Sequence, residues 1–199
     1  HSGNDIGDKT RENAAKLVAD LVSVLPQGVF YSEGDKVVTS CNLGGIESGD
    51  VKVTNVINTD AHATYSIRSS RKDKENELIA LMQNIVDEFN NDYQGIATAT
   101  ITFTEKMPMF EKNDDDIVPN IFEKVAKELG IEPEISSFHA GAETHIYASR
   151  TNAKGEKFSP YLLGLATVCN MHSAREYVDY KTMIKGQELL KAFFEAFNK

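Results

Sequence analysis

The chain has 199 residues, of which 41% are hydrophobic and 26% charged, and its formal net charge at pH 7 is -9. This composition is typical of a globular protein, and the sequence has no run of about 18 apolar residues that would predict a membrane span. The negative charge and the lack of Lys/Arg clusters exclude nucleic acid as an expected partner, because a phosphate backbone requires a basic face. The length suffices for two domains of about 100 residues each.

Two cysteines, Cys41 and Cys169, lie far apart in the sequence. Their spacing predicts neither a disulfide framework nor a cysteine-based zinc site, and we expect the reducing cytosol as the compartment. The polar segment of residues 1–11 lacks the apolar stretch of a signal peptide. Because the chain opens on His1 rather than on methionine, we expect its natural start to lie upstream.

Two amphipathic helices are predicted in the first half of the chain. Apolar residues recur at helical spacing from about residue 10 to residue 25, and Pro26 with Gly28 ends this segment. A second apolar stripe spans residues 78–89, and Gly95 ends it.

Three strand segments are predicted around these helices. Segments 36–43 and 51–69 carry β-branched and alternating residues on either side of glycine turn signals, which predicts paired strands. Apolar residues alternate with threonine over residues 97–104, which predicts a strand with one buried face. The expected order in the first half is therefore αββαβ.

The pattern breaks from Met107 to Asp116, where Pro108, charged residues and the acidic run 114–116 predict a domain boundary, and we divide the chain after residue 107. An ordinary surface loop is the alternative. The elements predicted beyond it are a helix from near Pro119 to Gly130, a short strand near Ile135, a helix over residues 141–150, an apolar strand over residues 161–168 and a final helix from about Asp179. This βαβ-like order and the continuous apolar strand are typical of mixed or parallel sheets, so the fold class is α/β. The second half is small for an independent α/β domain, and we expect it to be the end of a larger one.

Histidines are the natural candidates for metal binding or acid–base chemistry. His139 and His145 flank Glu143, but positions six apart do not share a helix face, so a zincin site is disfavoured. His172 follows the predicted apolar strand and precedes the last helix, where open α/β sheets place their ligands. A packed or solvent-facing side chain remains the alternative for any lone histidine.

Two candidate binding residues lie in the predicted strand of residues 51–69. Arg68 lies at its end, where the guanidinium could bind a carboxylate, although a solvated surface arginine is the alternative. Asn55 is a poor strand former, which indicates either a required hydrogen bond or a bulge or edge position. The sequence contains no phosphate-binding glycine loop, nucleophile elbow or Cys/His catalytic pair.

Several short motifs follow one another in a characteristic order: the segments that begin at His1, Asn55, Ile67, His139 and His172. Together they resemble the cocatalytic zinc peptidase family (clan MH), which contains aminoacyl-histidine dipeptidase and peptidase T. The chain departs from the family pattern at Asn58 and Ala174, where proline is usual, and at Arg175, where an acid is usual. These departures loosen the assignment to a subfamily.

The resemblance implies a division of the chain and a role for each motif. Residues 1–107 would form a lid that also mediates dimerisation, and residues 108–199 would be the C-terminal part of the catalytic domain. His172 would bind one of two Zn2+ ions, and His1 would stabilise the oxyanion of the tetrahedral intermediate, usually across the dimer. The substrate-binding residues that the resemblance implies are Asn55, Arg68, Gly141 and Glu143.

The resemblance also implies an activity. We expect the parent protein to be a zinc-dependent exopeptidase that hydrolyses di- or tripeptides by metal-activated water and forms a homodimer. The remaining metal ligands of the family precede the lid, and one histidine cannot hold a zinc pair, so we expect this chain to be an inactive fragment. The alternatives are an amidohydrolase of N-acyl amino acids and a non-catalytic dimerisation or small-molecule binding module.

Overall fold

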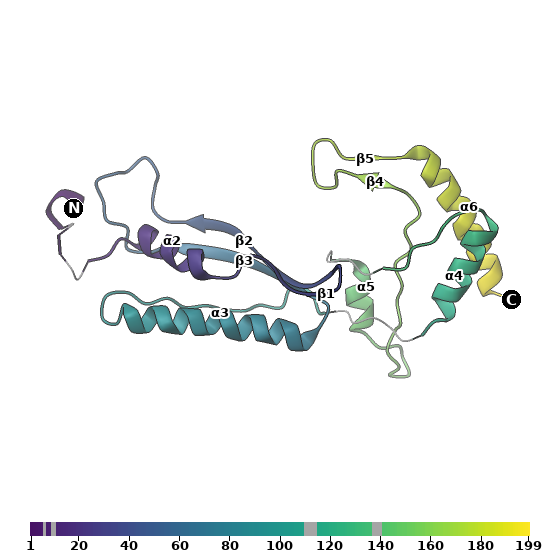
Figure 1. Cartoon of the computed structure of the whole chain (residues 1–199), viewed down its shortest axis with the longest axis horizontal. Helices are drawn as coiled ribbons and strands as arrows, with labels where there is room; N and C mark the ends of the chain where they lie inside the picture. The colour runs from purple at the N-terminus through teal and green to yellow at the C-terminus, as the bar shows by residue number, and fades with distance from the viewer. Residues whose placement is uncertain (6, 9–10, 110–114, 137–140) are drawn as a thin grey trace. The chain divides into compact units, whose positions relative to one another are not determined.

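The computed structural model describes residues 1–5, 7–8, 11–109, 115–136 and 141–199, and the chain folds into two compact units (Figure 1). The first unit is His1–Met109 and the second is Phe110–Lys199. The division falls after residue 109, whereas the sequence predicts it after residue 107. No helix in the described part of the chain is long and apolar enough to cross a membrane.

The first unit is a three-stranded antiparallel sheet, in the order β1-β2-β3, packed against two helices. Its elements are α1 (Ser2–Asp5), α2 (Ala14–Val24), β1 (Gly28–Glu33), β2 (Lys36–Glu47), β3 (His62–Ser69) and α3 (Lys72–Asp92). Helices α2 and α3 contact each other and both contact β2 and β3, so they cover the same face of the sheet (Figure 1). The core between these layers contains Leu25, Cys41, Leu78 and Met82.

Local sequence features explain both helices of this unit. Asn13 caps α2, because its side-chain oxygen accepts the Ala15 N–H at 2.9 Å. The buried residues of α3 are Leu78, Met82 and Val86, four residues apart, so one stripe of the helix faces the sheet. The two helices predicted from the sequence are therefore confirmed in position.

The strands of the first unit differ from the expectation. Residues 51–61 form a loop rather than part of a strand, so Asn55 lies in this loop and the prediction that placed it in a strand is wrong. Residues 97–104 form no strand in the structure; instead, the Asn90 side chain bonds the N–H and the C=O of Ala99 at 2.7 and 2.9 Å. Strand β1 was not predicted. The mixed α/β class is confirmed, but the order from α2 is αβββα rather than αββαβ.

The second unit packs two helices against each other. Its elements are α4 (Ile117–Glu128), α5 (Glu143–Ala148), β4 (Val168–Cys169), β5 (Tyr177–Val178) and α6 (Tyr180–Phe197). Val125 and Ala126 of α4 form a buried cluster with Leu189 of α6, and the rings of Phe122 and Phe193 lie 6.2 Å apart. The helices predicted near Pro119 and after Asp179 are confirmed.

The expected βαβ-like, parallel strands of the second unit are wrong. Residues 131–136 and 161–167 form no strands, and β4 pairs with β5 as a two-stranded antiparallel hairpin. An apolar run becomes a strand only when neighbouring strands satisfy its backbone groups. The 161–167 segment instead packs on α6: Thr167 N–H donates to Thr182 Oγ1 at 2.8 Å, and Asp179 N–H donates to Thr167 O at 2.9 Å.

Candidate functional site

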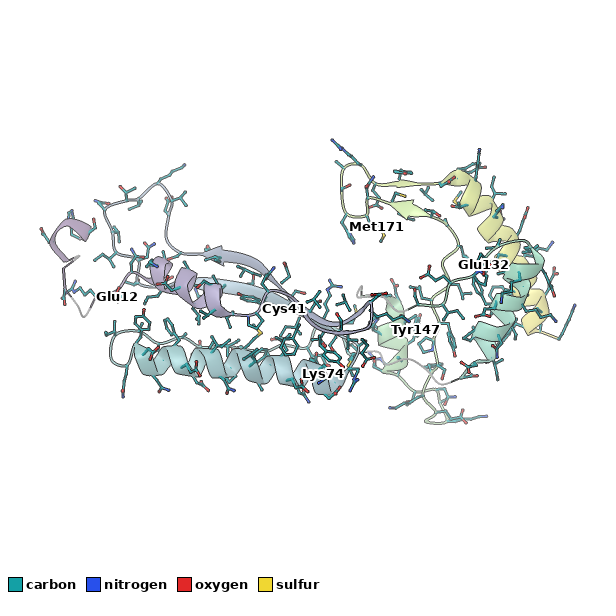
Figure 2. The ribbon with its side chains drawn as sticks, viewed as in Figure 1. Glu12, Cys41, Lys74, Glu132, Tyr147 and Met171 are labelled. Atoms are coloured by element: carbon teal, nitrogen blue, oxygen red, sulfur yellow. The ribbon has the colours of Figure 1, made fainter. Side chains whose placement is uncertain are left out.

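The loop between β4 and β5 carries His172, the residue that the sequence predicts as a metal ligand. Loop residues 170–176 are all exposed, and Figure 2 shows the neighbouring Met171 side chain in this loop. His172 has a backbone φ of 63° and Asn170 a φ of 55°, and these two are the non-glycine residues with positive φ in the described part of the chain. Asparagine and histidine enter this left-handed region more often than most non-glycine residues, but a residue with a Cβ atom still pays a steric cost there. Such strain at an exposed loop supports a functional role for His172.

Hydrogen bonds within the loop hold this conformation. The His172 N–H donates to Glu176 Oε2 at 2.7 Å. The Ser173 N–H donates to Asn170 O at 3.2 Å, and the Glu176 N–H donates to Ser173 O at 3.1 Å. Asn170 Nδ2 also donates to Arg175 O at 3.2 Å. The imidazole is therefore presented from a backbone that is fixed on both sides of it.

The structure brings the N-terminal segment and the Asn55 loop together. The Ser2 N–H donates to Asn55 O at 3.2 Å, so His1 lies one residue from this contact. The same loop also anchors the start of α2, because the Ala14 N–H donates to Asn58 O at 2.9 Å. Both His1 and Asn55 are exposed. The two candidate residues are thus neighbours within the first unit.

The loop that carries Asn55 is built on a tight turn. Gly49 has a φ of 60°, and a Cβ added there would lie 2.5 Å from Asn58 Oδ1, so the turn requires glycine. Ser48 Oγ donates to Asp60 O at 2.8 Å and joins the two ends of the loop. The Lys52 N–H donates to Asp50 Oδ1 at 2.9 Å, which makes Asp50 a turn residue. These contacts give Asn55 a defined position although it lies outside the sheet.

An open hollow of about 360 Å³ lies between the N-terminal segment and the residues Thr54, Val56 and Ile57. Its charged lining residues are Asp8, Arg11 and Glu12, and Figure 2 labels Glu12 next to this region. Arg11 Nε lies 3.3 Å from Asp8 Oδ2, so the cation already has an anionic partner. The polar lining suits a small polar molecule better than an apolar one.

Arg68 lies at the opposite end of β3 from the Asn55 loop. It pairs with Ser40 of β2, and six residues at about 3.3 Å each separate it from His62, or about 20 Å along the strand. Tyr65 and Ile67 pack against the core, so Arg68 points to the sheet face that α2 and α3 do not cover. Its side chain is exposed. The structure therefore does not place Arg68 beside Asn55.

Gly141 and Glu143 lie at the start of α5, and both are exposed. The His145 N–H donates to Ala142 O at 3.1 Å and closes the first turn of this helix. Among the described residues, no hydrogen bond or ion pair joins Gly141 or Glu143 to His172. His139 lies outside the described residues.

The residues present do not fit a complete metal site. Within the described ranges, no group of three or more His, Cys, Asp or Glu side chains is placed to hold a metal ion. A zinc site requires at least three protein ligands, whereas the His172 loop offers one imidazole and the nearby Glu176 carboxylate. No step through a metal follows from this structure. Glu176 was part of the motif read from the sequence, but only its contact with His172 indicates a role.

Both cysteines are free thiols, and their surroundings differ. Burial raises the pKa of the Cys41 thiol, whose Sγ donates to Pro26 O at 3.0 Å (Figure 2 labels Cys41 in the first unit). Because a nucleophilic cysteine needs a lowered pKa and access, Cys41 is a core residue. On the second unit, a hydrogen bond with the Cys169 side chain raises the pKa of Tyr177.

Comparisons with known proteins agree with the fold of both units. Residues 7–94 match the family described as the peptidase dimerisation domain. The whole chain superposes on aminopeptidase PepT from Bacillus cereus ATCC 10987 with a TM-score of 0.75 at 20% identity, and covers 48% of that protein. A tripeptidase from Staphylococcus aureus subsp. aureus Mu50 matches over 93% of this chain and 44% of its own length, with a TM-score of 0.70 at 20% identity.

A search of curated proteins found no match. The chain spans less than half the length of both matched peptidases, so these structures show its fold and not its activity. The family match covers the first unit from residue 7 to residue 94, which includes α2, the three-stranded sheet and α3. The comparisons agree with the family resemblance indicated by the sequence motifs, since residues 7–94 match the model of the peptidase dimerisation domain family.

Proposed function

We propose that this chain is part of a zinc-dependent exopeptidase that hydrolyses small peptides. The observation that carries the proposal is the order of its two units: a peptidase dimerisation domain is followed by a unit that superposes, in the same chain, on a peptidase. Residues 1–107 would be the lid and dimerisation domain of a cytosolic homodimer. Residues 108–199 would be the C-terminal part of the catalytic domain.

The site roles belong to the same proposal. His172 would be one zinc ligand, and its exposed imidazole on a fixed, left-handed backbone supports this role. His1 would stabilise the oxyanion, and its position beside the Asn55 loop supports a shared function for the two residues. The residues proposed to contact the peptide substrate are Asn55, Arg68, Gly141 and Glu143.

We also propose that this chain alone is inactive, since the described residues do not complete a metal site. The test is to purify the chain, add zinc, remove the unbound metal by gel filtration, and measure the zinc retained and the hydrolysis of a tripeptide. We expect well below stoichiometric zinc and no hydrolysis above background. Stoichiometric, tightly held zinc would contradict the incomplete ligand set.

The peptidase activity is tested on the complete protein encoded by the gene. We expect zinc-dependent hydrolysis of tripeptides, and His172→Ala should lower kcat/KM by more than about 100-fold, because second-shell changes alone cost 10–100-fold at metal sites. His62→Ala is the matched control, since His62 is an exposed histidine on β3, and it should retain full activity. Hydrolysis of N-acetyl amino acids but not of tripeptides would show an amidohydrolase instead, and no hydrolysis of either would indicate a binding module.

A further inference from the structure

We propose that Glu176 is the positioning residue that holds His172 in its left-handed backbone conformation. Its carboxylate accepts the His172 N–H at 2.7 Å from four residues further along the chain. The consequence for catalysis rests on the proposed function, in which His172 is a metal ligand. The positioning itself is a property of this loop and needs neither metal nor substrate.

The backbone of Glu176 is anchored at the edge of the hairpin. The next residue, Tyr177, pairs with Cys169 in the β4–β5 ladder. The Glu176 N–H donates to Ser173 O at 3.1 Å, which fixes the backbone on its other side. The carboxylate therefore reaches back to His172 from a backbone held by the hairpin and by the loop.

Glu176 acts on His172 specifically. Within the described part of the chain, the other hydrogen bonds of the loop join Asn170, Ser173, Arg175 and Glu176 to one another, and none of them uses the His172 N–H or C=O. An ionised acceptor also forms a stronger bond to an N–H group than a neutral one. The carboxylate is thus the group that opposes relaxation of a non-glycine residue out of a left-handed φ of 63°.

Fixing φ at His172 fixes the direction of its Cα–Cβ bond, and with it the space that the exposed imidazole can reach. A ligand that is already oriented loses less conformational freedom when it binds. Glu176 therefore reduces the conformational entropy that His172 loses when its imidazole binds a partner, and it acts through the His172 backbone rather than through a contact with that partner.

The test is nuclear magnetic resonance of the full 199-residue chain with Glu176→Ala, Glu176→Gln and Glu188→Ala. Two quantities are measured at His172: the exchange rate of its amide, and the nuclear Overhauser enhancement between its amide and Hα protons, which is strongest at positive φ. We expect Glu176→Ala to speed the exchange about ten-fold and to weaken the enhancement, as expected for the loss of one charged hydrogen bond. Glu176→Gln keeps a side-chain acceptor and should restore both values in large part. Glu188 is exposed on α6 and serves as the control.

Two results would overturn the proposal. One is a His172 amide whose exchange and enhancement do not change in Glu176→Ala. The other is an equal loss of protection at every amide from residue 168 to residue 178, because Glu176 would then stabilise the hairpin and not His172. If Glu176→Ala does not fold, Glu176→Asp, which shortens the side chain by one methylene, takes its place with the same expected changes. Neither measurement at His172 uses metal or peptide. Both results therefore keep their meaning even if the complete protein shows no peptidase activity.

Discussion

The two units of this chain differ in how completely they bury their apolar side chains. The first unit encloses a core between a three-stranded sheet and two helices, with Leu78 and Met82 almost completely buried. The second unit buries mainly the contact between α4 and α6 and has strands of two residues each. Among its described residues, large apolar side chains with about half or more of their surface exposed include Tyr147, Leu162, Tyr177, Tyr180 and Phe194. We infer that the first unit is stabilised by its own core, and that the second depends on a few close contacts.

The largest expected effect is in the core of the first unit. Leu78 has an exposed fraction of 0%, so Leu78→Ala removes a fully buried side chain and should destabilise this unit by about 3 kcal/mol. Leu81 lies on the same helix with 39% exposure, and Leu81→Ala should cost less than about 1 kcal/mol. Hydrogen exchange by mass spectrometry reports each unit separately. Equal loss of protection in both units would show that they are not stabilised independently.

The elements that the sequence predicts correctly are those whose signals are local. Helices α2, α3, α4 and α6 were predicted because their apolar stripes are local. Local side-chain caps add to this for α2 and α6: Asp179 caps α6 through its contact with the Lys181 N–H at 2.9 Å. Strands require partners that are distant in sequence, so alternation over residues 97–104 and an apolar run over residues 161–168 did not suffice. In β1, Gly28 was read as the end of a helix, whereas it begins a strand.

The sequence names candidate site residues, which stay predictions, but it did not predict the local geometry around them. The sequence places His172 after a strand and before a helix, yet the strand is half of a short antiparallel hairpin rather than part of a parallel sheet. The β-branched residues near Asn55 suggested a strand, but the turn at Gly49 and Asp50 bends the chain into a loop. The left-handed φ of His172 has no signature in the sequence, because glycine or asparagine is the usual residue there.

A second, smaller effect is expected where the 161–167 segment meets α6. A Cβ on Gly186 would lie 1.7 Å from Leu165 O, so Gly186→Ala must push the segment off the helix. In an exposed helix this change would stabilise by up to about 1 kcal/mol, but here the clash should dominate and destabilise the second unit by about 2 kcal/mol. The readout is hydrogen exchange in peptides from α6 compared with peptides from α3.

The matched control for this contact is Gly164→Ala. Gly164 is exposed and a Cβ there meets no atom within 4 Å, so the substitution should change stability by less than about 0.5 kcal/mol. If Gly186→Ala instead stabilised the second unit, the segment would not be held against α6, and the unit would depend on the α4–α6 contact alone.

The smallest expected effect concerns the strained loop of the second unit, and its sign is opposite. Glycine adopts a φ of 63° without steric cost, so His172→Gly should relieve strain and raise the free energy of unfolding of this unit by about 0.5–1 kcal/mol, after allowance for the greater freedom of glycine in the unfolded chain. Arg175 lies in the same loop and is not among its positive-φ residues, so Arg175→Gly should lower stability by about 0.5 kcal/mol. Both changes are measured by a urea titration in which hydrogen exchange at α6 reports unfolding.

A stabilising His172→Gly would mean that histidine is kept at this position at a cost to stability, as expected for a residue with a binding role. A destabilising His172→Gly of the same size as Arg175→Gly would instead show that the loop stores no strain at His172.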